Sequence, residues 1–214
     1  MRSYLTEFIG TFFLVLTVCL TVIGAVPMAP LAIGASLMIM VYMGGHVSGG
    51  HYNPAVSLAV LLRGKMASAG EFVAYVASQV AGAIAAALAA YVITGKTFAP
   101  APADSASTLA ALLVETLFTF ALALVVLNSA VSAKTQGNSF YGLAIGFTIV
   151  VGAFAGGSIS GGAFNPAVGT GPILVNAALG GGSLAHWWLY LVGPFTGGVL
   201  AAGVFGIQEG SGGR

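Results

Sequence analysis

The sequence is short of charged residues. Only 5% of its 214 residues are Asp, Glu, Lys or Arg, whereas 58% are hydrophobic. Soluble domains usually carry about a quarter charged residues, so this composition excludes an ordinary soluble protein. The six Lys and Arg residues are scattered, which leaves no basic patch for nucleic acid. We therefore expect a membrane protein without a nucleic-acid partner.

Cysteine is also nearly absent. The single residue, Cys19, excludes a disulfide framework, and its position in an apolar run indicates a small buried filler. The first apolar run lacks the small-residue cleavage pattern of a signal peptide, so it is expected to remain as a span. The sequence contains no nucleophile–base pair or metal-ligand cluster, which predicts neither an enzyme nor a metal or cofactor site.

Long apolar stretches are abundant instead. A helix crosses a bilayer with roughly 20 mainly apolar residues, and six stretches meet that requirement. They are residues 4–24, 31–48, 70–93, 108–128, 140–158 and 185–207. The sequence therefore predicts an all-α membrane protein with six transmembrane helices.

Two shorter apolar pieces, residues 54–62 and 166–178, each begin at an Asn-Pro and reach about half the length of a span. Non-helical backbone at membrane depth is tolerated only where it lines a cavity or is buried in protein. We interpret both pieces as re-entrant half-helices, each preceded by an extended glycine-rich loop. The connections are short, which favours a single transmembrane domain over residues 1–214.

The positive charges predict the orientation, because cytoplasmic loops carry an excess of Lys and Arg. With the N-terminus inside, only Lys96 of the six cations lies outside. The cytoplasmic cations are then Arg2, Arg63, Lys65, Lys134 and Arg214. Both termini are expected in the cytoplasm, in an integral protein of the plasma or inner membrane.

One polar stretch occurs twice. Residues 44–56 read GGHVSGGHYNPAV and residues 156–168 read GGSISGGAFNPAV, which indicates an internal duplication. Each half has an odd number of spans, so the second half inserts upside down relative to the first. The predicted inverted repeats cover about residues 1–93 and 108–207, joined by a linker at 94–107. The two Asn-Pro-Ala loops then meet near the membrane midplane from opposite sides.

Each Asn-Pro predicts a helix start, because Asn is a good N-cap and Pro suits the first helical position. If Asn53 and Asn165 cap through their side-chain oxygens, their NH2 groups are free to donate into a pore. Two facing half-helix N-termini add roughly half a positive charge each, which repels cations. The half-helix starts are completed by Pro54, Ala55, Pro166 and Ala167.

Glycine pairs precede both asparagines, at Gly49-Gly50 and Gly161-Gly162. We predict an extended backbone there, whose carbonyls line a narrow pore. The predicted pore-lining loop residues are Gly49, Gly50, His51, Gly161 and Ala163. His51 is expected to border the cytoplasmic half of the pore, and His46 either packs structurally or gates weakly.

Glu7 and Glu115 occupy matching positions in the first and fourth spans, where a carboxylate is a functional candidate. One interpretation is ion coupling, as in a transporter. The other is that each carboxylate accepts hydrogen bonds from the re-entrant loop of its own half. Gln79, in the third span, is predicted to form a hydrogen bond between helices, and His186 to belong to an interfacial belt with Trp187 and Trp188.

Together, the duplicated Asn-Pro-Ala loops, the six spans and the paired glutamates resemble the aquaporin and glycerol-facilitator family, the major intrinsic proteins, over roughly residues 4–207. The resemblance implies an aquaporin-like, right-handed bundle of six helices with two half-helices. It also implies one pore per subunit and, usually, a homotetramer. By this resemblance, Asn53 and Asn165 are the paired pore asparagines, and Glu7 and Glu115 support the loops.

The sequence departs from the family directly after the second Asn-Pro-Ala, where most members have Arg and this chain has Val168. Spacing from the asparagines assigns the four positions of the family's outer constriction to Ile33, Ala153, Gly162 and Val168. Water-selective relatives usually have an aromatic residue, a His, a small residue and Arg at these positions. Lys96 is the sole conceivable substitute for the missing cation. We predict a wider and more apolar outer gate.

Two functional hypotheses follow. The first is a passive channel in the lipid bilayer for water and other small neutral solutes of the size of glycerol or urea. The second is a secondary transporter coupled through Glu7 and Glu115, since such transporters also use inverted repeats and broken helices. The substrate markers are mixed: Gly169 stands where glycerol-conducting relatives carry Asp, and Tyr190-Leu191 combines an aromatic typical of water channels with an aliphatic typical of glycerol facilitators.

Overall fold

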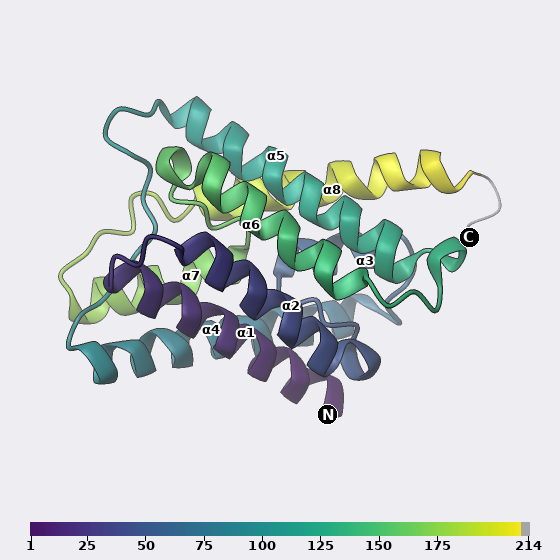
Figure 1. Ribbon diagram of the computed structural model, residues 1–214, viewed down its shortest axis with the longest axis horizontal. Helices are drawn as coiled ribbons and strands as arrows, with labels where there is room; N and C mark the ends of the chain where they lie inside the picture. The colour runs from purple at the N-terminus through teal and green to yellow at the C-terminus, as the bar shows by residue number, and fades with distance from the viewer. Residues whose placement is uncertain (211–214) are drawn as a thin grey trace.

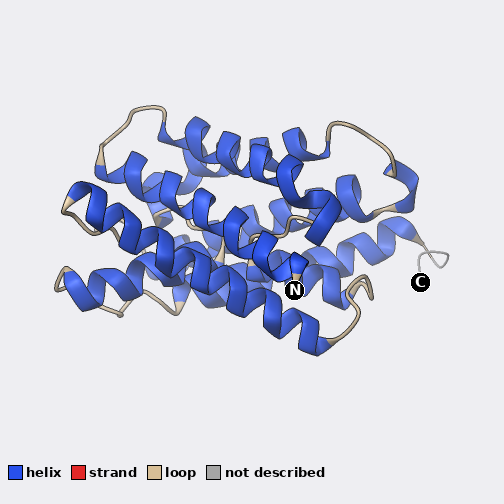
Figure 2. Ribbon diagram, turned by 90° about the horizontal axis from the view of Figure 1, so that it is seen from below, coloured by secondary structure: helices blue, strands red, loops and turns tan. Residues whose placement is uncertain are grey.

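The computed structural model describes residues 1–210, and its regular elements are helices packed as a tilted bundle (Figures 1 and 2). Six of them are long and apolar enough to cross a membrane. These are α1 (Arg2–Ile23), α2 (Ala29–Ser48), α4 (Ala69–Thr94), α5 (Thr108–Val126), α6 (Tyr141–Ser160) and α8 (Leu189–Glu209). Within the described residues no strand is formed, which confirms the all-α membrane fold.

The predicted ends of the spans agree with the helices to within about four residues. The largest difference is at the last span, which begins at Leu189 because the preceding residues form a turn. In that turn the Trp187 N–H donates to the Leu184 carbonyl at 3.0 Å. At the end of the fourth span, α5 continues into a π-helical turn, η1 (Leu127–Val131), followed by a short 3₁₀ turn, η2 (Ala133–Thr135).

The two half-helices are α3 (Pro54–Leu62) and α7 (Pro166–Leu179), as the sequence predicts to within one residue. Both lie among the long helices in Figure 1, with α7 toward the left of the bundle and α3 toward the right. The end of α3 lies beside the end of α8, where the Arg63 guanidinium is 5.8 Å from the Phe205 ring. The end of α7 lies beside the end of α4, where the Thr97 hydroxyl donates to Asn176 at 2.7 Å. The half-helices therefore point toward opposite ends of the bundle.

Close helix crossings depend on glycine. Where α2 crosses α6, a Cβ on Gly146 would lie 2.5 Å from the Gly34 carbonyl oxygen, and a Cβ on Gly34 would lie 2.5 Å from the Gly146 carbonyl oxygen. Where α5 crosses α8, a Cβ on Gly197 would lie 2.5 Å from the Thr116 carbonyl oxygen. Small residues allow such close backbone approach in membrane proteins, where dispersion rather than the hydrophobic effect holds helices together.

The outward surface of the bundle is apolar. In the most apolar window of each long helix, no more than 44% of the residues are buried. The remaining side chains face outward, and their polarity indicates whether water or lipid surrounds the bundle. Many of them are large and hydrophobic: along α6, Phe147 and Phe154 are 48% and 52% exposed. A surface of this kind fits lipid rather than water, and the chain is an integral membrane protein.

One end of the bundle collects both ends of the described chain. The Ser3 hydroxyl donates to the Val47 carbonyl at the end of α2, at 3.2 Å. Beyond α5, the Ser132 hydroxyl donates to Glu209, the last residue of α8, at 2.5 Å. An even number of crossings has this result, because each long helix reverses the direction of the chain.

Candidate functional site

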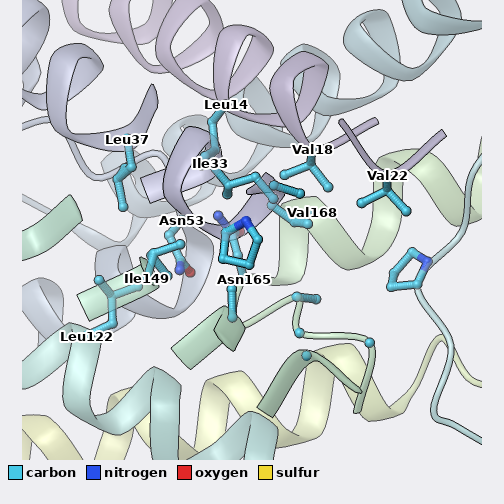
Figure 3. A pocket seen from close by; sticks show the side chains of 18 of the residues that line it. Leu14, Val18, Val22, Ile33, Leu37, Asn53, Leu122, Ile149, Asn165 and Val168 are labelled. Atoms are coloured by element: carbon cyan, nitrogen blue, oxygen red, sulfur yellow. The ribbon is translucent and has the colours of Figure 1, made fainter. Parts of the chain in front are cut away.

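A cavity of about 390 Å³ lies where the two half-helices meet in the middle of the bundle. Figure 3 shows Asn53 and Asn165 inside it, among apolar side chains such as Leu14, Ile33 and Val168. The lining repeats between the halves of the chain, with Leu14 and Leu122 at equivalent positions in α1 and α5. Besides the two asparagines, the one polar side chain among the described residues of the lining is that of His51.

Each asparagine caps its half-helix, as the sequence predicts. Asn53 Oδ1 accepts the N–H of Ala55 at 2.9 Å, and Asn165 Oδ1 accepts the N–H of Ala167 at 2.9 Å. Pro54 and Pro166 occupy the first helical positions, where a missing N–H leaves no bond unmade. Both helix N-termini, with their partial positive charges, are therefore directed at the cavity.

The two caps are also bonded across the cavity. Asn53 Nδ2 donates to the Phe164 carbonyl at 2.9 Å, and Asn165 Nδ2 donates to the Tyr52 carbonyl at 2.8 Å. The predicted free NH2 groups are therefore partly occupied, because one N–H of each asparagine already has an acceptor. An amide NH2 has two hydrogens, so one N–H of each asparagine fixes the opposite loop and one remains for the cavity.

The glycine pairs before the asparagines turn the chain rather than extend it. Gly49, Gly50, Gly161 and Gly162 have φ angles of 86°, 62°, 88° and 64°. The predicted extended backbone is wrong, because α2 and α6 remain helical as far as Ser48 and Ser160 and leave only four residues before each asparagine. So short a reversal needs left-handed conformations, which glycine adopts without a Cβ clash.

Tyr52 and Phe164 close these loops in a strained conformation. Their φ angles are 48° and 49°, uncommon for bulky residues, and both side chains are fully buried. Such strain persists only where the surroundings hold the backbone in place. The carbonyls turned inward by these two residues are the ones that accept the bonds from Asn165 and Asn53.

Glu7 holds the first loop. One carboxylate oxygen accepts the Ser48 hydroxyl at 2.6 Å and the His51 N–H at 3.0 Å. The other accepts the Tyr52 N–H at 2.7 Å and the Gln79 amide at 2.7 Å. A fully buried carboxylate with four donors is strongly held in place, so the structure places Glu7 behind the loop and outside the cavity lining.

Glu115 holds the second loop through the same kind of bonds. It accepts the Ser160 hydroxyl at 2.7 Å, the Ala163 N–H at 3.0 Å and the Phe164 N–H at 2.7 Å. It is also fully buried. Among the described residues, the second half has no counterpart to the bond from Gln79, since Glu115 has three donors there and Glu7 has four.

Two tyrosines complete the support, and reasoning from the sequence did not predict this role for either of them. The Tyr75 hydroxyl donates to the Ser48 carbonyl at 2.8 Å, and the Tyr190 hydroxyl donates to the Ser160 carbonyl at 2.6 Å. The sequence signal available for this support was the serine repeated in the two matching stretches, Ser48 and Ser160, whose carbonyls accept these bonds. The tyrosines themselves come from α4 and α8, whose contact with the loops depends on the fold.

The four residues assigned to the outer constriction all line the same cavity. Ile33 comes from α2, Ala153 from α6, Gly162 from the second loop and Val168 from α7. Val168 is 4% exposed. Their side chains offer neither a cation nor a hydrogen-bond donor at this level of the cavity.

The linker also reaches the cavity, which the sequence did not predict. Residues 98–101 are part of the lining, and a Cβ on Gly161 would lie 2.8 Å from the Ala101 carbonyl oxygen. Phe98 is partly buried against the core. Lys96, by contrast, is exposed and lies outside the cavity lining, so it does not replace the missing arginine.

The other single residues divide between confirmed and open predictions. Cys19 is buried in the core as expected, and Gln79 bonds between helices as expected. His46 is exposed, which argues against structural packing, and weak gating stays a prediction. His186 and Trp188 are exposed, whereas Trp187 is partly buried and donates to the Thr170 hydroxyl at 3.0 Å, and the interfacial belt stays a prediction.

Comparison with known proteins adds independent findings. The sequence model of the family described as Major intrinsic protein matches residues 1–205. The chain is 37% identical over 207 residues to Glycerol uptake facilitator protein-like 6 of Lactiplantibacillus plantarum, covering 90% of this chain and 91% of the relative. It is 32% identical to Putative aquaporin NIP4-1 of Arabidopsis thaliana, over 89% of this chain and 69% of the relative.

The fold is also similar to a solved structure, the aquaglyceroporin from Plasmodium falciparum. The TM-score is 0.82, with 95% of this chain and 94% of that chain covered and 22% sequence identity. At this identity the likeness concerns the fold, with its six spans and two half-helices.

Proposed function

The chain belongs to the major intrinsic protein family, and we propose that it is a passive channel for water and for small neutral solutes of the size of glycerol and urea. Members of this family are channels rather than enzymes. The relatives reported above include proteins named as a glycerol uptake facilitator and an aquaporin. Both names describe the passage of small uncharged molecules, which supports this class of solute here.

The observation that carries the proposal is the pair of asparagines in one cavity. Each keeps one N–H for the cavity after the other is bonded to the opposite loop, and each stands at a helix N-terminus. Donors fixed in this way replace part of the hydration shell of a hydrogen-bond acceptor. The partial positive charges of the two helix ends oppose cations, so this level of the pore excludes cations.

The size of the solute follows from the outer constriction that we assign to Ile33, Ala153, Gly162 and Val168. Their place in the cavity lining supports the assignment. With Val168 where Arg is usual, the constriction loses bulk, donors and a positive barrier. Solutes larger than water then pass, and exclusion of cations depends on the two asparagines.

The transporter alternative has no comparable support. Coupling needs an ionisable group that meets the solute or the coupling ion. Glu7 and Glu115 are fully buried and are occupied by loop donors. Their bonds fit a role as loop-supporting carboxylates, which is the role we propose for them.

We further propose the orientation with both termini in the cytoplasm. Arg63 and Lys134 lie at the end of the bundle that contains Ser3 and Glu209, and Lys96 follows the opposite end of α4. That asymmetry is what cytoplasmic loops require. Arg214, counted with the cytoplasmic cations, lies outside the described residues. Accessibility of single cysteines introduced beside Lys65 and Lys96 to an impermeant reagent tests this assignment in cells.

Two further parts of the proposal concern organisation. The chain is a single channel domain made of inverted repeats, about residues 1–93 and 108–207, with a linker at 94–107. The matching bonds of Glu7 and Glu115 support this division. We also propose a homotetramer in the plasma or inner membrane, as is usual in the family, which native mass spectrometry of the purified protein tests.

A swelling assay tests the function directly. Purified protein is reconstituted in vesicles, and stopped-flow light scattering follows the response to water, glycerol and urea gradients. We expect faster relaxation than in protein-free vesicles for all three. Vesicles that pass water but exclude glycerol and urea overturn the wide constriction. Accumulation of a solute driven by a pH or sodium gradient overturns the channel itself.

A further inference from the structure

A chain of polar side chains lies beside the first loop and, among the described residues, has no equivalent beside the second. It runs from Glu7 through Gln79 and Ser57 to His51. We propose that Gln79 and Ser57 are positioning residues that hold His51 as the neutral tautomer with its proton on Nε2, which makes His51 a third donor to the permeating solute. This inference rests on the proposed channel function only for the role of the solute.

The first step is the orientation of the Gln79 amide. Its Nε2 lies 2.7 Å from a Glu7 carboxylate oxygen and 3.0 Å from Ser57 Oγ. The Glu7 carboxylate already accepts the backbone N–H groups of His51 and Tyr52, which can only donate. The opposite amide orientation places an oxygen against these carboxylate oxygens, so the NH2 group faces Glu7 and donates to Ser57 as well.

The second step is the direction of the Ser57 hydroxyl. Ser57 is fully buried, and its oxygen accepts the bond from Gln79. Its remaining neighbour within hydrogen-bond distance, among the described residues, is His51 Nδ1 at 3.1 Å. A buried hydroxyl proton without an acceptor costs about 1–3 kcal/mol, so the hydroxyl donates to Nδ1. Nδ1 is then unprotonated, and the ring proton is on Nε2.

The third step is where Nε2 points. The ring lines the cavity, and in residues 1–210 its Nε2 forms no hydrogen bond and is not among the enclosed polar atoms without a partner. A Cβ on the exposed Gly49 would lie 2.9 Å from Nε2. The Nε2 edge of the ring therefore faces open space at the start of the loop, where a solute can reach its N–H.

The second half of the chain shows that this arrangement is not part of the loop support itself. Counted from the asparagines, Ala163 and Gly169 replace His51 and Ser57. Counted from the tyrosines that bond the two loops, Pro194 replaces Gln79. The second loop nevertheless has the same bonds to its glutamate. The polar chain therefore serves His51 and not the fold of the loop.

The consequence concerns the solute. The cavity offers fixed N–H donors from Asn53, Asn165 and His51, and the histidine donor lies in one half only. A neutral molecule with several lone pairs, such as water or a polyol, meets donors in succession along this half. An imidazole with its proton on Nδ1 presents an acceptor at the same place and breaks that series.

Nitrogen NMR of the protein in lipid bilayers reads the tautomer directly. In a His46→Gln/His186→Gln variant, which first has to swell vesicles like the wild type, His51 is the single ¹⁵N-labelled histidine. We expect Nδ1 at the shift of an unprotonated ring nitrogen and Nε2 at that of a protonated one. A spectrum with the proton on Nδ1, or with comparable amounts of both tautomers, overturns the proposal. This test leaves all four residues of the polar chain unsubstituted.

Substitution of Ser57 tests the positioning role. Ser57→Ala should give a mixture of tautomers and about a three- to tenfold lower water permeability, the range expected for one hydrogen bond. Ser57→Thr keeps the hydroxyl and should restore both. Ser78→Ala is the matched control, because Ser78 directly precedes Gln79 in α4 and its hydroxyl donates to the Ala74 carbonyl instead. An unchanged tautomer in Ser57→Ala overturns the positioning role, and an altered tautomer with unchanged permeability overturns the donor role.

The two proposals fail separately. A wild-type protein that does not conduct water overturns the proposed function, whereas the tautomer of His51 is still measured by NMR.

Discussion

Asn53 and Asn165 each donate one amide hydrogen to the backbone carbonyl beside the other. Asn53 bonds the Phe164 carbonyl at 2.9 Å and Asn165 bonds the Tyr52 carbonyl at 2.8 Å. The residues that the sequence singles out for the pore are therefore also the cross-link between the two half-helices. Stability and conduction depend on the same two amide groups.

Asn165→Asp separates the cap of α7 from the cross-link. Aspartate keeps an oxygen to cap α7 but loses the donor to the Tyr52 carbonyl, which leaves a buried acceptor unpaired at a cost of about 1–3 kcal/mol. We expect a lower melting temperature in detergent by thermal unfolding. Asn176→Asp is the control, because Asn176 acts as an acceptor for Thr97 near the end of the same helix. Equal melting of the two variants contradicts the cross-link.

Glu7→Gln should destabilise the protein more than Glu115→Gln. The amide replaces one carboxylate oxygen with a donor, and each buried N–H or hydroxyl that loses its acceptor costs about 1–3 kcal/mol. Glu7 serves four donors and Glu115 three. Glu71→Gln is the control, since this partly exposed residue accepts a single backbone bond from Ala67. Unfolding in denaturant measures the order, and the reverse order is the result against it.

Val168→Arg should narrow the outer constriction. The guanidinium adds bulk, donors and charge beside Ile33 and Ala153 in the cavity lining. We expect glycerol permeability to fall about tenfold, equivalent to roughly 1.4 kcal/mol in the barrier, with water permeability reduced much less. Val168→Met adds bulk without charge and distinguishes the two causes. A solute profile identical to that of the wild type in stopped-flow swelling places Val168 elsewhere than at the constriction.

Gly146→Ala tests the crossing of α2 and α6. The added Cβ would lie 2.5 Å from the Gly34 carbonyl oxygen, so the helices have to separate, at about 1–3 kcal/mol for overpacking. Gly203→Ala in α8 is the matched control, because a Cβ there has no neighbour within 4 Å among the described residues. In a helix that exchange is favourable by about 1 kcal/mol. Thermal unfolding should therefore move in opposite directions, and parallel shifts count against this packing.

The sequence alone determined most of the architecture. Apolar length sets the six spans, because the bilayer requires about 20 residues for each crossing. The repeated Asn-Pro sets the starts of α3 and α7, because capping is a local property of Asn and Pro. The same spacing assigned Ile33, Ala153, Gly162 and Val168 to one level, and the structure brings all four to one cavity.

Only the tertiary structure decided what each polar group is bonded to. The asparagine NH2 groups were expected to be free, yet one N–H of each is taken by a carbonyl more than a hundred residues away. The glycine pairs were expected to extend, yet the helices before them run on and force a tight reversal. Tyr75, Tyr190 and residues 98–101 reach the loops and the cavity from elements distant in the sequence. Local preferences fix where helices begin and end, but hydrogen-bond partners depend on which segments the packed bundle brings within about 3 Å.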